Sequence, residues 1–205
     1  MTLRVRSSLL VLPGLVLAQG VLGGARTALF LAVALGVCAV VTALARLSMA
    51  ALLGLGHRRT VLHGLGASHD WGRLPLRKAM LVHSAGVLAV GLVTLVCWGQ
   101  PSYLARTVAA IGVFWTAIQA APIQPTCGGD AAWSLLVYGL GPVRGPEWST
   151  GITLVGGIAG CWVGLQLGML FLIPLCGVAV HNGWRSYRTR RTEPAELLAL
   201  PGAPA

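Results

Sequence analysis

Residues 119–136 read QAAPIQPTCGGDAAWSLL, and this stretch interrupts an otherwise apolar region of the chain. Its centre, 122–129, holds two prolines and two glycines in eight residues, which cannot continue a regular helix. Apolar runs flank it at 105–121 and 130–140. The second run is too short to cross a bilayer, which needs about 20 residues. We predict two helices joined by a broken segment, with Asp130 as the N-cap of the second helix.

The composition of the 205 residues excludes a soluble fold. Apolar residues make up 56% of the chain and charged residues 10%, compared with about 25% charged residues in ordinary soluble domains. A soluble protein of this size could not bury so much apolar surface, so lipid is an expected partner. The net charge of +10 lies in flanks and loops without interleaved aromatic residues, so we expect no nucleic-acid partner.

Hydrophobic runs predict an all-α integral membrane protein with five to six transmembrane helices and a Pro/Gly-broken segment near 122–129. The runs cover 8–24 (a retained signal anchor), 27–56, 79–98, 105–121 and 150–180, with 130–140 as a half-helix. Between the second and third runs, 57–78 is polar, carries five basic residues and predicts a small loop or hairpin at the membrane surface. The stretch 141–149 is rich in turn formers and predicts a loop.

The distribution of basic residues predicts a multi-pass topology. We expect residues 1–183 to form one transmembrane domain and 184–205 a flexible basic tail. The positive-inside rule places the N-terminus and 57–78 in the cytoplasm. A cytoplasmic tail then requires either that 130–140 helps to complete a sixth passage or that the 150–180 run turns back. Lys78 is the one lysine among 15 basic residues, and this bias, with abundant Ala, Gly and Leu, suggests a bacterial inner (plasma) membrane.

Four glycines of the last run recur every four residues, at Gly156, Gly160, Gly164 and Gly168. Such a stripe lets another backbone approach one helical face closely. We therefore predict helix packing on this face. The partner is either another helix of this chain or a second membrane subunit.

Polar residues within the apolar runs are the candidate site residues. An ionisable group at membrane depth costs about 2.5–3.5 kcal/mol on insertion scales, so each needs a reason. The candidates are Thr42, Arg46 and Gln119 for binding and His83, Cys127 and Asp130 for catalysis. Their structural alternatives are a snorkelling arginine, an interfacial histidine and a capping aspartate. The five cysteines include no Cys-x-x-Cys pair, which argues against a zinc knuckle or a disulfide framework.

The broken segment resembles the third core-helix motif of the site-2 protease family, the intramembrane zinc metalloproteases. That motif reads Asn-x-x-Pro, then a short Pro/Gly stretch, then a metal-binding Asp-Gly before a helix. Pro122 matches the proline and Asp130 the aspartate, whereas Gln119 replaces the Asn and Ala131 the Gly. A tighter register would place Cys127 on the aspartate. Weaker matches in 52–72 and after His83 extend the resemblance over about 36–140.

The zinc motif of that family is missing. Those proteases bind zinc through His-Glu-x-x-His on one helical face, with the Glu as general base. The corresponding residues read TALAR from Thr42 to Arg46, and the printed chain contains no HExxH. We therefore expect no metal and no cofactor, and no zinc proteolysis. The resemblance would pair Arg46 with Asp130, because buried charges persist mainly when paired.

Three functions remain open at this point. The first is a non-proteolytic subunit on this scaffold that binds a peptide or a partner helix during maturation or assembly. The second is a metal-independent enzyme that isomerises, epimerises or dehydrates a peptide in bacterial natural-product maturation, with Cys127, Asp130 and His83 as acid and base groups. The third is a small transporter or channel subunit, although the chain shows no internal repeat.

Overall fold

The computed structural model describes residues 2–5, 11–56, 59–63, 66–70, 75–124, 126–166, 173–174, 176–181 and 183–184. The chain divides into two compact units, Met1–Ala120 and Ala121–Ala205. The sequence-based boundaries of one domain over 1–183 and a tail over 184–205 stay predictions.

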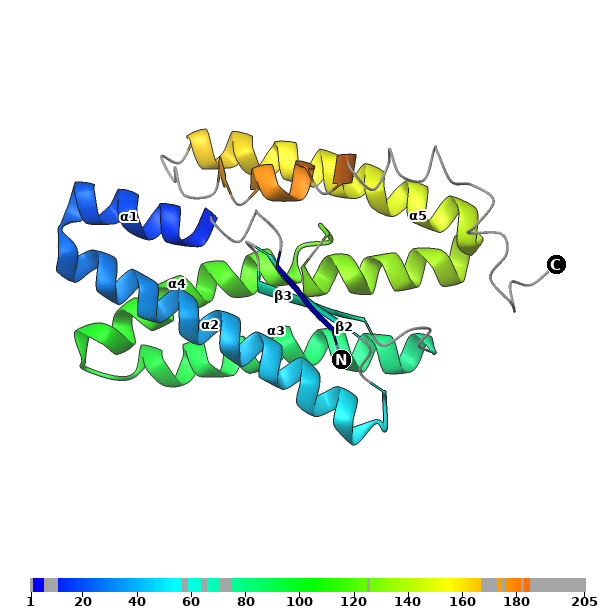
Figure 1. Cartoon of the computed structure of the whole chain (residues 1–205), viewed down its shortest axis with the longest axis horizontal. Coiled ribbons are helices and arrows are strands. Elements are labelled where there is room, and N and C mark those ends of the chain that lie inside the picture. Colours follow the sequence, from blue (N-terminus) through cyan, green and yellow to red (C-terminus); the bar gives the residue numbers. More distant parts are fainter. Residues whose placement is uncertain are drawn as a thin grey trace. The chain divides into compact units, whose positions relative to one another are not determined.

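The first unit is a helical bundle (Figure 1). Its helix α2 packs against α3 and α4, α3 packs against α4, and α1 packs against α2. The chain reverses between α1 and α2 at Gly24, whose φ of 84° lies in the left-handed region that glycine adopts without steric cost. The helices are α1 (Val11–Gly23), α2 (Ala25–Leu52), α3 (Leu76–Trp98) and α4 (Tyr103–Ala120).

A three-stranded sheet accompanies this bundle. Strand β2 (Arg59–His63) forms an antiparallel hairpin with β3 (Gly66–Asp70), and β1 (Thr2–Val5) pairs with β2 in parallel. Of the loop or hairpin predicted for 57–78, the structure shows a hairpin, and its place at the membrane surface stays a prediction. The all-α prediction holds for the membrane part of the fold, and the sheet adds short strands in the N-terminal segment and in the connection between α2 and α3.

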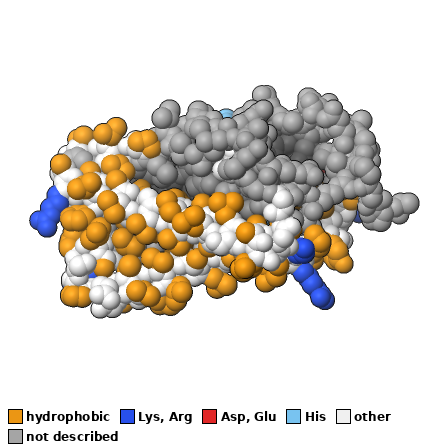
Figure 2. All heavy atoms as spheres, turned by 60° about the horizontal axis from the view of Figure 1, so that its bottom comes forward, with side chains coloured by type: hydrophobic (Ala, Val, Ile, Leu, Met, Phe, Trp, Pro, Cys, Tyr) orange, Lys and Arg blue, Asp and Glu red, His pale blue; other side chains and the backbone are white. Residues whose placement is uncertain are grey.

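Three of the described helices are long and apolar enough to cross a membrane: α2, α3 and α5 (Cys127–Gln166). Large apolar side chains stay exposed along α3, including Leu88, Leu92 and Leu95. Hydrophobic side chains also dominate the described part of the face in Figure 2, with Lys and Arg near its ends. Exposed apolar helix faces of this kind are suited to lipid. The number of crossings, five to six, stays a prediction.

The second unit begins with a helical hairpin. Helix α5 consists of two helices that meet at Gly141, where φ is 84° and ψ is 173°, and the two parts run antiparallel in Figure 1. A Cβ on Gly145 would overlap the backbone of Leu136 and Val137, so the turn is tightly closed. The predicted loop at 141–149 is wrong, because Pro142 begins the second helix, where its missing N–H is not needed.

The predicted 150–180 run does not continue as one helix. Helix α5 ends at Gln166, and residues 176–181 form another helical segment. This segment packs back on α5: the Cβ position of Gly157 lies 2.6 Å from Val180 Cγ2, and that of Gly183 lies 3.1 Å from Thr153 Cγ2. Of the two alternatives for the C-terminal region, the structure favours a chain that turns back.

Candidate functional site

Arg46 lies inside the helical bundle of the first unit. It shares one face of α2 with Cys38 and Thr42, and each of these residues is at most 5% exposed. Only 1% of Arg46 is accessible, so the alternative of an arginine that snorkels to the membrane surface is wrong. A guanidinium buried this deeply must exchange its hydration for protein hydrogen bonds.

His83 supplies one of these bonds. Arg46 Nη2 lies 3.0 Å from His83 Nδ1, across the contact between α2 and α3. A guanidinium only donates hydrogen bonds, so Nδ1 must accept and a neutral imidazole carries its proton on Nε2. His83 is 7% exposed, so its ring lies inside the bundle, and its depth relative to the membrane interface stays a prediction. The bond therefore fixes both the tautomer and the orientation of the ring.

Trp115 of α4 binds the same face of α2 one turn away. Its Nε1 donates to Thr42 Oγ1 over 3.1 Å, and that hydroxyl donates to the Cys38 carbonyl over 2.7 Å. Trp115 is 2% exposed. Thr42, Arg46, His83 and Trp115 thus form a buried cluster from three helices, which we call the polar centre.

Gln119 follows Trp115 by one helical turn and is 2% exposed, so both lie on the inner face of α4. Sequence reasoning selected Gln119 and missed Trp115. The four-residue spacing between them was the available signal, because residues at i and i+4 share a helical face.

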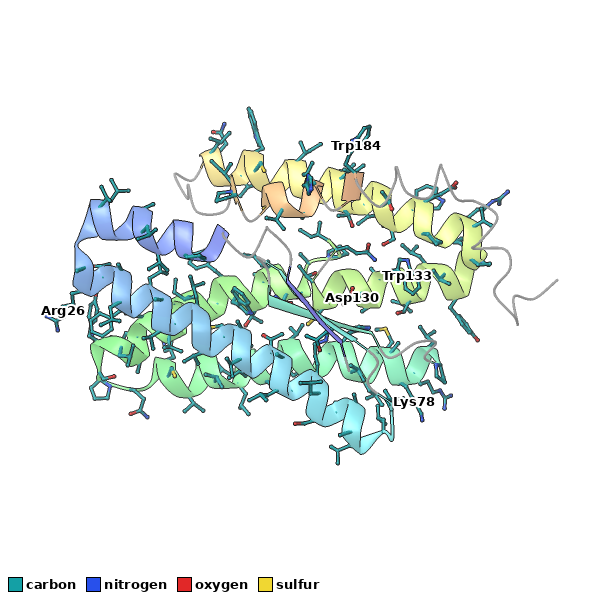
Figure 3. All side chains as sticks on the ribbon, in the orientation of Figure 1. Arg26, Lys78, Asp130, Trp133 and Trp184 are labelled. Carbon is teal, nitrogen blue, oxygen red and sulfur yellow. The ribbon has the colours of Figure 1, made fainter. Side chains whose placement is uncertain are left out.

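The polar centre lies near the end of the bundle from which the β2–β3 hairpin extends. Lys78 Nζ donates to the Leu53 carbonyl over 3.1 Å and ties the start of α3 to the end of α2. Arg46 precedes Leu53 by seven residues, or roughly 10 Å along the helix axis. Figure 3 shows Arg26 at the opposite end of α2 from Lys78.

In the second unit, the backbone of the broken segment obtains its hydrogen bonds from nearby hydroxyl groups. Gln124 N donates to Thr153 Oγ1 over 3.0 Å, and Thr153 Oγ1 donates to the Ser149 carbonyl. The Thr126 hydroxyl donates to the carbonyls of Ala121 and Ile123. Irregular backbone in a membrane protein requires such internal partners.

Thr126, rather than Asp130, caps α5. Gly129 N donates to Thr126 Oγ1 over 3.0 Å, and Asp130 N donates to the Thr126 carbonyl. The prediction of Asp130 as the N-cap is therefore wrong. Asp130 lies in the first turn, where its negative charge suits the helix dipole. Cys127 begins the helix and is 1% exposed.

The predicted site residues are thus divided between the two units. Thr42, Arg46 and His83 meet in the first unit, whereas Cys127 and Asp130 belong to the second. The pairing of Arg46 with Asp130 and the catalytic roles of Cys127, Asp130 and His83 stay predictions. Within the described ranges, no three His, Cys, Asp or Glu side chains are grouped to hold a metal ion.

The glycine face of α5 contacts residues of its own unit. The Cβ position of Gly156 lies 3.5 Å from Ile123 Cγ2, and that of Gly160 lies 2.5 Å from Cys176 Sγ. Gly157, which sequence reasoning did not select, also lies against the 176–181 segment. Gly164 is buried, and Gly168 is outside the described residues.

Known proteins resemble this chain in structure. No family model matches it. No curated protein matches it in sequence either. A solved structure, the site-2 protease from Methanocaldococcus jannaschii, aligns with a TM-score of 0.75 over 90% of this chain and 89% of its own. The chain has a site-2-protease-like fold. Sequence identity is 14%, so the likeness concerns the scaffold alone.

Proposed function

We propose that the protein is a non-proteolytic membrane protein on a site-2-protease-like scaffold, which binds a peptide as a maturation or assembly subunit. One observation carries the proposal. The turn from Thr42 to Arg46 has no His or Glu, and both of its inward side chains are hydrogen-bonded, to Trp115 and His83. The resemblance places the zinc motif on this turn.

The chemistry of this turn does not suit zinc hydrolysis. Threonine and arginine replace the two imidazole ligands, and Ala43 stands where the general-base carboxylate would be. A guanidinium brings positive charge without a coordination site, because it has no lone pair to offer a metal. We therefore expect the polar centre to bind a polar group of the peptide and not to activate water for hydrolysis.

The sheet offers a means of binding an extended peptide. Among the described strands, β3 is at one edge, where it pairs with β2 and packs against α2. The outer edge of such a strand presents backbone N–H and C=O groups to which a peptide can add as a further strand. Because β3 contacts α2, a captured segment would lie beside the helix that carries Thr42 and Arg46.

Zinc binding and proteolysis provide the first test. We expect the full chain in liposomes to hold substoichiometric zinc by elemental analysis and to leave a transmembrane model peptide intact. The matched variant is T42H/A43E/R46H, which writes HExxH onto the turn and should gain zinc. Stoichiometric zinc in the wild type, or cleavage abolished by Asp130→Ala, would overturn the non-proteolytic assignment.

Peptide binding is tested separately by hydrogen–deuterium exchange. The probe is a positional-scanning library of extended decapeptides added to the reconstituted protein. Slower exchange of the Gly66–Asp70 amides, with no change in the connection at 99–102, is the expected result. Unchanged exchange in β3 with every pool would refute peptide capture by this edge, whatever the zinc content.

A further inference from the structure

Two thiols meet in the second unit. Cys161 lies on α5 and Cys176 on the 176–181 segment, and the Cβ position of Gly160, the neighbour of Cys161, lies 2.5 Å from Cys176 Sγ. Cys161 Sγ donates to the Ile173 carbonyl over 3.6 Å, so its thiol faces the chain three residues before Cys176. Both cysteines are free thiols. Both thiols thus lie where the 173–181 part of the chain packs on α5.

The glycine face explains how the two backbones come close enough for a covalent bond. Helices separated by ordinary side chains have axes about 8–10 Å apart. The Cβ position of Gly157 lies 3.3 Å from both Cys176 O and Val180 N, so the 176–181 backbone lies directly on α5. A disulfide needs its two Cα atoms within about 4.4–6.8 Å, a separation that close glycine packing makes accessible.

We propose that Cys161 and Cys176 are a redox-active dithiol that oxidises to an intramolecular disulfide. Both S–H bonds break and one S–S bond forms. The two electrons and two protons pass to a membrane quinone, which becomes the quinol. The bond ties the 176–181 segment covalently to α5.

The surroundings of the pair favour a lipid-soluble oxidant. Apolar surface lies beside the half-buried Cys161 thiol. Three residues that neighbour Cys161 on α5 are each at least 46% exposed, namely Trp162, Val163 and Leu165. Cys176 is 9% exposed. A quinone shares the apolar phase with these side chains, whereas a charged disulfide such as oxidised glutathione stays in water.

The test counts free thiols in the full chain reconstituted in liposomes. Protein treated with an isoprenoid benzoquinone, or with the matching quinol, is denatured in detergent, alkylated with N-ethylmaleimide and weighed by mass spectrometry. We expect the quinol sample to carry five adducts, one for each cysteine, and the quinone sample to lose two of them. Proteolysis between residues 161 and 176 should then give fragments that separate only after reduction.

Single variants identify the pair. Cys161→Ala and Cys176→Ala should each abolish the quinone-dependent loss of two adducts. Cys97→Ala, a half-buried thiol of the first unit, is the matched control and should keep it. The proposal is overturned if the wild type retains five adducts with quinone, if the loss persists in Cys161→Ala, or if only oxidised glutathione produces it.

Discussion

Two helix contacts in this protein are built in opposite ways. The inner face of α2 is joined to α3 and α4 by hydrogen bonds between large side chains, and Arg46 and Trp115 are among the largest that are fully buried. The inner face of α5 contacts the 176–181 segment through Gly157 and Gly160. Lipid is as apolar as leucine, so helices in a membrane associate through polar contacts or close backbone packing. One chain uses both solutions.

The difference predicts opposite sensitivities. The polar centre should be sensitive to changes of chemistry at constant size. The glycine face should be sensitive to changes of size, whatever the chemistry. Substitutions in the two regions can therefore separate the two modes of packing.

The largest effect is expected for His83→Leu, which removes an acceptor from the buried guanidinium of Arg46 at similar side-chain volume. A hydrogen bond to a buried charged group contributes up to about 3 kcal/mol, and we expect a loss of this order. Unfolding of the full chain in a mixed-micelle denaturant titration measures it. His83→Asn is the control, because Oδ1 can take the place of Nδ1; equal losses in both variants would contradict the hydrogen-bond argument.

An intermediate effect is expected for Gly157→Leu. The new side chain would collide with the Cys176 carbonyl and the Val180 amide, and overpacking of this kind costs about 1–3 kcal/mol. We expect the 176–181 segment to separate from α5, and the rate of maleimide labelling at Cys176 reports this. Gly151→Leu is matched, because a Cβ at Gly151 meets nothing within 4 Å. If Gly151→Leu accelerated labelling as much, close packing would not be the cause.

The smallest effect is expected for Trp115→Phe, which removes the Nε1 donor to Thr42 and keeps most of the buried ring. One neutral hydrogen bond contributes about 1 kcal/mol, and the same titration should show a loss of that size. Trp98→Phe changes a side chain that is 67% exposed and should leave the unfolding midpoint unchanged. A null result for Trp115→Phe would mean that ring packing alone stabilises the contact between α2 and α4.

The sequence was sufficient for the helices of the first unit because each of them is a long apolar run that polar or turn-forming residues separate from the next. The predicted run at 79–98 and the observed α3 differ by three residues at one end. The short strands were harder, since four or five residues carry little pattern, and the polar character of 57–78 left a loop and a hairpin as alternatives. The 141–149 loop failed because proline and glycine also begin helices, as Gly141 and Pro142 do here.

The polar centre was predicted in part. Thr42 and Arg46, both selected as candidate binding residues from the sequence, are four residues apart and lie on one buried face of α2. The resemblance would pair Arg46 with the carboxylate of Asp130, and the structure adds the imidazole of His83 as a hydrogen-bond acceptor. Periodicity shows which residues share a face of one helix. It does not show which residue of the next helix lies opposite, because that depends on the crossing angle and register.

The bond from Lys78 to the Leu53 carbonyl has a consequence for how freely the intervening segment can vary. It holds the two ends of the 54–77 connection together independently of what lies between them. For a flexible loop, doubling the length adds only about 0.6 kcal/mol of closure entropy. Changes of length in the turns of this connection should therefore cost the bundle little closure entropy, provided that the pairing of β2 with β1 and the contact of β3 with α2 are kept.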